Sequence, residues 1–257
     1  MSLPKIKLID VSKTFDGQRA LDGISLEVAN GESLVLIGGS GSGKSLLLKT
    51  ILGLVPPDSG CIEIDGQDSV GLSENERMVW MQRFGVLFQR QGLFDSLTVW
   101  ENVAFRLLQD PAIDKSTARA RAVEKLASVG LTADTADLYP AELSGGMQKR
   151  VGLARAIATD PEIIFLDEPT AGLDPIMSNV ISELIVARKS DLGATIISVV
   201  SDMAVVREIA ERVVMLHDGR IVWSGTVDEL GTTDNAYVHQ FVNQLIDGPI
   251  QMPSLAV

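Results

Sequence analysis

The stretch G-G-S-G-S-G-K-S at residues 38–45 decides the fold of this chain. It matches in full the spacing G-x-x-x-x-G-K-[ST] of a phosphate-binding loop. The apolar residues 34–37 predict a buried strand before it, and residues 46–52 predict a helix after it. Strand, loop and helix in this order are the context that the motif requires. The alternative, a glycine- and serine-rich surface turn, leaves the Lys-Ser pair and both flanks unexplained.

The residue types of this loop suit it to hold a triphosphate. Glycines let the backbone turn tightly enough for successive N–H groups to face phosphate oxygens, and the positive end of the following helix reinforces them. We expect Lys44 to reach the β- and γ-phosphates and Ser45 to place its hydroxyl on Mg²⁺. The residues expected to bind the nucleotide here are Gly38, Gly39, Ser40, Gly41, Ser42, Gly43, Lys44 and Ser45.

Length and charge narrow the class of protein. A chain of 257 residues accommodates one large α/β domain or two modest ones. Its net charge of -12 argues against nucleic-acid binding and against attachment to anionic lipid by a basic patch.

Cysteine content and hydropathy indicate the compartment. The single cysteine, Cys61, excludes an internal disulfide and suits a reducing environment. No apolar stretch reaches the roughly 18 residues that a spanning helix needs, and the first residues lack the apolar core of a signal peptide. We therefore expect a soluble, cytoplasmic protein without direct membrane insertion, whose membrane role comes through a partner.

Hydrophobic periodicity and turn signals divide the chain into elements. Strands are expected at residues 5–11, 20–28, 34–37, 61–65, 84–88, 163–166, 194–200, 212–216 and 220–224, and helices at residues 46–52, 72–82, 175–189, 204–210 and 237–246. The pattern predicts an α/β fold: a P-loop NTPase core with a mostly parallel sheet flanked by helices, an N-terminal antiparallel β subdomain and a helical subdomain. The expected domains are residues 1–234, with the helical subdomain inserted at about 92–159, and a helical tail at residues 235–257.

A second element of the phosphate site is the sequence I-I-F-L-D-E at residues 163–168. Its apolar residues predict a buried strand that ends in two carboxylates. Asp167 is expected to hold Mg²⁺, and Glu168 to orient or deprotonate the attacking water. An acidic strand end without function is the alternative, and the presence of a phosphate loop in the same chain disfavours it.

The segment L-S-G-G-M-Q at residues 143–148 precedes a predicted long helix that runs to Thr159. Ser144 is an N-cap candidate, and Gly145 and Gly146 expose backbone N–H groups at a positive helix end. This pattern predicts a second anion-binding surface. One chain does not need two such sites, unless each serves a nucleotide that is held by another copy; a plain helix cap is the alternative.

The phosphate loop, L-S-G-G-M-Q and L-D-E-P-T-A-G-L-D at residues 166–174 together resemble the ATP-binding subunit of an ABC transporter over residues 5–230. The resemblance implies ATP and Mg²⁺ as cofactors. It also implies a head-to-tail homodimer in which residues 144–146 of one copy close over the ATP of the other. By the same likeness Phe15 stacks on adenine, Gln89 touches Mg²⁺ and senses a membrane partner, and Asp174 couples the two sites. A plain core phenylalanine is the alternative for Phe15.

Closer likeness points to a subgroup. Residues 85–89, 92–105, 146–150, 238–242 and 248–250 resemble the ATPase of Mla-type, MCE-associated phospholipid transporters. This resemblance implies phospholipid movement between inner and outer membranes, with integral-membrane permease subunits and an MCE-type lipid-binding protein as partners. The subunit would then be cytoplasmic and peripheral on the inner membrane. The ATPase of another small-molecule importer is the alternative.

One residue departs from the family pattern. Counting forward from Glu168, Ser201 falls where the family places a histidine that contacts the γ-phosphate, and His217 is expected at the surface. Serine donates one hydrogen bond but has a shorter reach and carries no charge. We therefore expect ATP binding and dimer closure to persist while hydrolysis is slow. The residues expected to take part in catalysis are Glu168, Lys44, Gln89 and Ser201, and those expected to hold Mg²⁺ are Ser45, Gln89 and Asp167.

Three functions stay open on the residues alone. The first is a transport motor, in which motion passes through residues 89–105 to a membrane partner, with Leu93, Phe94 and Trp100 as candidate exposed contacts. Ordinary helix packing is the alternative for these three side chains. The second is a nucleotide-gated switch with little turnover. The third, a P-loop kinase or DNA-repair ATPase, is disfavoured because the chain has no second substrate lid, coiled-coil insertion or basic groove.

Overall fold

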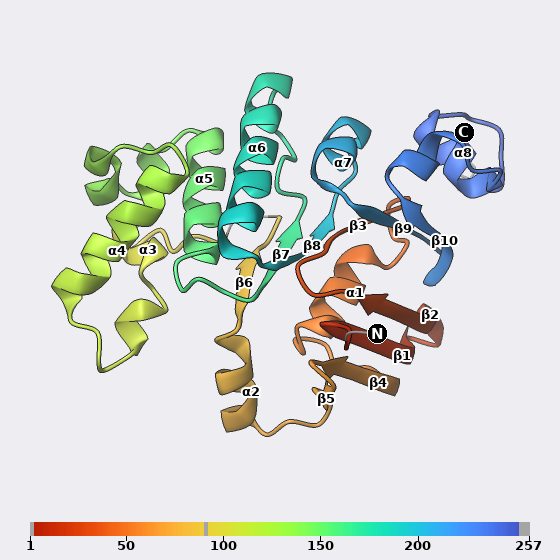
Figure 1. Ribbon diagram of the computed structural model, residues 1–257, viewed down its shortest axis with the longest axis horizontal. Coiled ribbons are helices and arrows are strands. Elements are labelled where there is room, and N and C mark those ends of the chain that lie inside the picture. Colours follow the sequence, from red (N-terminus) through yellow and green to blue (C-terminus); the bar gives the residue numbers. More distant parts are fainter. Residues whose placement is uncertain (1–2, 90–91, 252–257) are drawn as a thin grey trace. The chain divides into compact units, whose positions relative to one another are not determined.

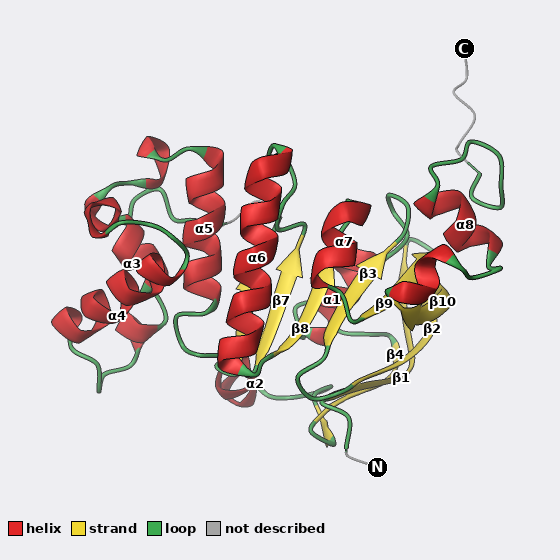
Figure 2. Ribbon diagram, turned by 45° about the horizontal axis from the view of Figure 1, so that its top comes forward, coloured by secondary structure: helices red, strands yellow, loops and turns green. Residues whose placement is uncertain are grey.

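The computed structural model describes residues 3–89 and 92–251 (Figures 1 and 2). The chain divides into two compact units. The first unit comprises Met1–Gly71 and Val199–Val257, and the second comprises Leu72–Ser198. The first unit therefore joins the two ends of the chain, while the second is one continuous segment.

An antiparallel sheet forms the N-terminal part of the first unit. Its strands, in the order β2-β1-β4-β5, are β2 (Gln18–Val28), β1 (Ile6–Phe15), β4 (Ser59–Ile64) and β5 (Gln67–Asp68). β1 and β2 are joined by Asp16 and Gly17, which both have positive φ angles, of 48° and 79°. Two such residues in succession are typical of the turns whose twist matches an antiparallel hairpin.

Three more strands of this unit follow the order β10-β9-β3, with β3 parallel to β9. They are β3 (Ser33–Ile37), β9 (Arg212–His217) and β10 (Arg220–Thr226). The helices of the unit are α1 (Lys44–Ile51), α7 (Met203–Ile209), the 3-10 turn η4 (Asp228–Gly231) and α8 (Ala236–Val242). The predicted hairpin at residues 217–219 is confirmed, because β9 and β10 pair antiparallel on either side of it.

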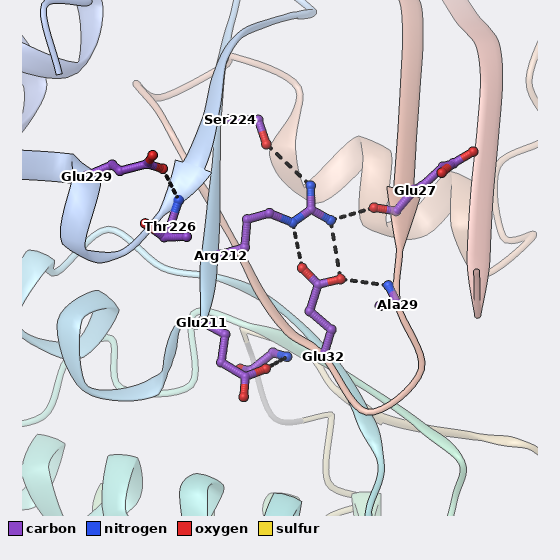
Figure 3. A network of polar contacts seen from close by, with 9 residues as sticks. Glu27, Ala29, Glu32, Glu211, Arg212, Ser224, Thr226 and Glu229 are labelled. Atoms are coloured by element: carbon purple, nitrogen blue, oxygen red, sulfur yellow. Dashed lines mark hydrogen bonds and ion pairs between the residues drawn. The ribbon is translucent and has the colours of Figure 1, made fainter. Parts of the chain in front are cut away.

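A network of polar contacts connects the start of β9 with the segment that leads into β3 (Figure 3). The Arg212 guanidinium donates through Nε to Glu32 Oε1 at 2.5 Å and also bonds the Glu27 carbonyl and, at 3.3 Å, Ser224 Oγ. Glu32 accepts a further bond from the Ala29 amide at 2.6 Å. Because all of these partners lie in the first unit, the network holds its two sheets together through one side chain.

The C-terminal helix is shorter than its periodicity predicts. Residues 237–246 predict one amphipathic helix, but α8 ends at Val242 and Gln244 has a φ of 54°. Gln240 supplies the physical reason, because its side chain bonds the chain that follows. Its Nε2 donates to the Ile250 carbonyl at 3.1 Å, and its Oε1 accepts from the Ile250 amide at 2.7 Å.

The second unit contains three strands in the order β8-β7-β6, with β6 parallel to β7. They are β6 (Phe84–Leu87), β7 (Ile163–Asp167) and β8 (Thr195–Val199), whose last residue counts with the first unit. Its helices are α2 (Glu74–Met81), α3 (Val99–Val103), α4 (Lys115–Ser128), α5 (Gly145–Ala156) and α6 (Pro175–Leu192), with 3-10 turns at Leu107–Gln109, Ala133–Asp137 and Pro140–Glu142.

The segment between β6 and β7 is helical, as its periodicity predicts, and α3, α4 and α5 pack on one another. This packing makes one prediction wrong. Trp100 was a candidate exposed contact, but only 6% of it is exposed, so the alternative of ordinary helix packing holds for this residue. Phe94 is exposed as expected and its ring contacts Phe105, with 4.6 Å between the centroids.

The predicted α/β fold is confirmed: an antiparallel sheet, mostly parallel strands flanked by helices, and a helical region all occur. The boundary after residue 234 stays a prediction, because α8 belongs to the first unit together with the strands before it. Among the residues that the structure describes, no helix combines the length and the apolar character needed to cross a membrane.

Candidate functional site

The phosphate loop connects β3, all of whose residues are buried, to α1. The loop begins at Gly38, which has a φ of 140°. A Cβ at this position would lie 2.2 Å from the Leu216 carbonyl oxygen in β9. Both the backbone angle and the close approach therefore require glycine, and the start of the loop is pressed against a neighbouring strand.

The end of the loop presents the amino terminus of α1. Gly43 is the N-cap residue, with a φ of 103° and no side-chain hydrogen bond to the first turn. A Cβ there would lie 2.9 Å from the Ala20 carbonyl oxygen. A helix start of this kind points its first N–H groups and the positive end of its dipole toward the loop, which favours an anion there.

Lys44 lies inside the loop that it belongs to. The residue is buried, and its Nζ donates to the carbonyl oxygens of Gly38 at 2.8 Å and Gly39 at 2.7 Å. Ser42 Oγ lies 3.3 Å from the same nitrogen. A positive charge surrounded by backbone is suited to bind phosphate oxygens, so the cradle fits a nucleotide phosphate. Ser45 follows in the first turn of α1 and is half-buried, whereas Ser40 and Gly41 are exposed.

Phe15 ends β1 and is 48% exposed, with Lys13 Nζ 5.5 Å from the centre of its ring. The alternative prediction, a plain core phenylalanine, is therefore wrong. An exposed aromatic face is available for stacking on a base. The adenine role of Phe15 stays a prediction.

Ser201 follows a residue that bonds β3, the strand that leads into the phosphate loop. The amide of the preceding Val200 donates to the Leu36 carbonyl of β3 at 3.2 Å, on the way into the loop. Ser201 is exposed and is followed by Asp202, whose carboxylate caps α7.

His217 was expected at the surface, but its side chain is only 19% exposed. The ring of His217 packs on Tyr237 of α8 with 4.9 Å between the centroids, which is why this side chain is half-buried rather than fully at the surface.

The two carboxylates of the second unit follow the fully buried strand β7. Asp167 is its last residue and is buried, and Glu168 is the next. Glu168 has a φ of 51°, in the left-handed region that costs a residue other than glycine about 1–2 kcal/mol. Strain of this kind persists where the surrounding structure holds it, and it concentrates at functional sites.

The segment at residues 144–146 begins α5 as predicted. Ser144 is the N-cap, and its Oγ accepts from the Met147 amide at 3.3 Å. Gly145 is exposed with open space at the position of a Cβ, whereas a Cβ at Gly146 would lie 3.1 Å from Met177 Cε. The glycines therefore leave the backbone of this helix start accessible on one side and packed on the other.

Asp174 and Gln89 complete the predicted residues of the second unit. Asp174 is the N-cap of α6, and its carboxylate accepts from the Met177 amide at 3.0 Å. Met177 in turn contacts Gly146, so the segments at Asp174 and at residues 144–146 lie side by side. Gln89 follows β6 and is exposed, next to residues 90–91, which lie outside the described residues.

Lys149 is a residue of this site that sequence reasoning missed. It lies in α5 and is only 3% exposed. Its Nζ donates to the Glu168 carbonyl at 3.1 Å and to the Gln89 carbonyl at 3.3 Å. The available signal was its position, because Gly152, Leu153 and Ala156 at spacings of three, four and seven residues lie on the same buried helix face.

The structure thus gathers the predicted residues into two groups. The first unit holds the phosphate loop, Phe15 and Ser201, and the second holds Gln89, residues 144–146, the carboxylates and Asp174. The described part of the chain contains no cluster of three or more His, Cys, Asp or Glu that could hold a metal. The Ser45 hydroxyl and the Asp167 carboxylate are each of a type that binds Mg²⁺, which typically takes one or two carboxylates together with phosphate oxygens and water.

Comparisons with known proteins agree with a nucleotide-binding site. The sequence profile of the ABC transporter family matches residues 21–171. Over 96% of its length the chain is 40% identical to the probable ribonucleotide transport ATP-binding protein mkl of Mycobacterium bovis, of which it covers 68%. It is 38% identical to protein trigalactosyldiacylglycerol 3, chloroplastic, of Arabidopsis thaliana and 40% identical to the methionine import ATP-binding protein MetN of Carboxydothermus hydrogenoformans. These similarities span 96% of the chain in both cases and 75% and 73% of the respective relatives.

The fold is also that of a solved protein. A dimeric ATP-binding cassette in a post-hydrolysis state, bound to ADP and Pi, superposes with a TM-score of 0.81 and 34% sequence identity. The match covers 86% of this chain and 98% of that one.

Proposed function

The chain belongs to the ABC transporter family as an ATP-binding subunit with ATP hydrolase chemistry, and on that premise we propose that it drives phospholipid transport. The proposal places ATP between two copies of the chain. In each copy the phosphate loop binds the triphosphate, and residues 144–146 of the other copy close over it. This arrangement accounts for two anion-binding surfaces in one polypeptide.

The residues of one copy then have distinct roles. Lys44 neutralises phosphate charge, while Ser45, Asp167 and Gln89 would hold Mg²⁺. Bound Mg²⁺ would supply charge stabilisation for the transferred phosphoryl group. Glu168 orients the attacking water and accepts its proton. Phe15 stacks on the adenine, and Asp174 lies beside residues 144–146 to couple the two halves.

The observation that carries this assignment is the strained backbone of Glu168, at a φ of 51° directly after a buried strand. The surrounding structure holds this backbone angle and so fixes where the Glu168 side chain begins, as the positioning of a general base requires. Glu168→Gln keeps the shape of the side chain and removes its basicity. We expect Glu168→Gln to hold an ATP-bound dimer in light scattering for longer than the wild type, which returns to monomer as it hydrolyses its ATP. A strictly monomeric variant in the presence of Mg-ATP and the membrane subunits would contradict the proposal.

Membrane attachment is proposed to come through a permease. Phe94 is exposed in the segment that follows Gln89, which suits it to receive a helix of a membrane subunit. Such an attachment would place the chain on the cytoplasmic side of the inner membrane. Purification of the tagged chain from detergent-solubilised membranes, compared with Phe94→Ala, tests this: loss of co-purifying membrane subunits supports the contact.

Phospholipid is proposed as the cargo class. The resemblance of residues 92–105 and 238–242 to MCE-associated ATPases supports it, as does a relative named after a galactolipid. Two other relatives are named for ribonucleotide transport and methionine import, and a small-molecule importer is therefore the competing proposal. Co-purification of an MCE-type protein and ATP-dependent transfer of labelled phospholipid between vesicles by the assembled complex would support the lipid assignment. ATP-dependent uptake of methionine by that complex would overturn it.

A slow-turnover switch is the second candidate function, and Ser201 favours it. Serine in place of a γ-phosphate-contacting histidine would leave binding and closure intact while slowing hydrolysis. Hydrolysis by the chain with its permease separates the two candidates, because a motor is stimulated by its membrane partner and a switch is not.

A further inference from the structure

One lysine of the second unit bonds two parts of the candidate site at once. Lys149 extends from α5, and its Nζ donates to the carbonyl oxygens of Glu168 and Gln89, at 3.1 and 3.3 Å. Glu168 follows β7 and Gln89 follows β6, and these two strands pair in parallel. The ammonium therefore joins the exits of two neighbouring strands to a helix that begins at Ser144.

The environment of Lys149 is unusual for a lysine. Only 3% of the residue is exposed, whereas lysines are rarely fully buried without partners. Burial lowers the pKa of its ammonium, and the negative charges of Glu168 and Asp167 oppose that effect. A lysine nitrogen can donate to several acceptors at once, which is what two carbonyls at neighbouring strand ends require. The cost of burying Lys149 is thus compensated by its bonds to the backbone of Glu168 and Gln89, two residues that are proposed to take part in catalysis.

The bond to Glu168 acts on the strained residue itself. Glu168 is in the left-handed region, so its backbone needs an outside contact to stay there. Lys149 supplies one such contact at the Glu168 carbonyl, directly beside the side chain that is proposed to handle the water. The bond to the Gln89 carbonyl likewise fixes the backbone at the start of the segment that is proposed to sense the membrane partner.

We propose that Lys149 is a positioning residue for hydrolysis, which fixes the Glu168 and Gln89 backbones relative to the helix that begins at Ser144. It is about one helical turn from Gly145 and Gly146. When the nucleotide of another copy closes on residues 144–146, α5 and Lys149 thereby pass the movement on to Glu168, the proposed general base. This inference rests on the proposed function, because it assigns Lys149 to the reaction of Glu168.

Two substitutions and one control test the inference in the full chain. Lys149→Met keeps most of the length of the side chain and removes the donor, and Lys149→Arg restores donors. Lys125→Met is the control, because Lys125 is a partly buried lysine of α4 that pairs with Asp160, away from the carboxylates. Single-turnover hydrolysis of ATP gives the rate of the chemical step, and titration with a fluorescent ATP analogue gives the affinity.

We expect Lys149→Met to lower the single-turnover rate by about 10²-fold, since small misplacements of a catalytic group cost that much. Nucleotide affinity should stay within about twofold, because the phosphate loop belongs to the other unit and keeps its own lysine. Lys149→Arg should recover most of the rate, and Lys125→Met should match the wild type. A purely structural role would not lower the rate while leaving the nucleotide affinity unchanged.

Three results would overturn the inference. They are an unchanged rate in Lys149→Met, a loss of rate and affinity in equal proportion, and a failure of Lys149→Arg to recover any rate in folded protein. Folding is checked by circular dichroism for each variant. A wild type that does not hydrolyse ATP even with its permease would instead refute the proposed function, and the role of Lys149 with it.

Discussion

Gly38→Ala is a sharp test of how the phosphate loop is built. The added methyl group would lie 2.2 Å from the Leu216 carbonyl oxygen, at a backbone φ of 140°. That separation is roughly 1.3 Å shorter than the ~3.5 Å at which non-bonded heavy atoms reach favourable contact. Neither partner can rotate away, because one atom is a Cβ fixed by the loop and the other belongs to the backbone of β9.

The expected cost follows from two effects. Overpacking of a well-packed interior costs about 1–3 kcal/mol. Forcing a residue with a Cβ into a left-handed conformation costs about 1–2 kcal/mol more. Together they predict a loss of about 2–5 kcal/mol in the free energy of unfolding. For a chain of this size each kcal/mol lowers the melting temperature by roughly 2–4 °C, so a fall of roughly 4–20 °C is expected.

Gly39→Ala is the matched control, because a Cβ at Gly39 would meet no atom within 4 Å. Thermal unfolding without nucleotide is followed by circular dichroism and by tryptophan fluorescence, to which Trp223 contributes from the unit that holds the loop. We expect Gly38→Ala to melt well below the wild type and Gly39→Ala to melt within a few degrees of it. Equal melting temperatures for the two variants would refute the argument from close approach.

Three other substitutions have defined outcomes. Ser201→His should raise steady-state hydrolysis by about 10²-fold or more if a transition-state donor is missing, and an unchanged rate would mean that another group fills the role. Phe15→Ala should weaken ATP binding by about 1–3 kcal/mol in a nucleotide titration while leaving the melting temperature nearly unchanged, since the ring is exposed; unaltered affinity would exclude stacking. Arg212→Met should cost about 2–3 kcal/mol in urea unfolding, because it leaves Glu32 without the guanidinium that it bonds, and the double variant with Glu32→Met should recover part of that loss. Additive losses in the double variant would contradict this account of the network.

Local sequence determined the elements and most of the candidate residues. The phosphate loop, the caps at Ser144 and Asp202, and the hairpin at residues 217–219 depend on neighbours within a few positions. Interactions of this range leave a pattern of residue types at fixed spacing. The α/β fold was predictable for the same reason, because buried strands and helices alternate along the chain.

Tertiary structure decided the features that join distant positions. Sequence periodicity did not reveal that Trp100 is buried or that Gln240 ends α8 early. It also could not show that Lys149 bonds the Glu168 and Gln89 backbones, or that Leu216 presses on Gly38. These contacts join residues that are several to more than a hundred positions apart. Burial and hydrogen bonding at such sites depend on which surfaces meet when the chain folds, and that is a property of the packed structure.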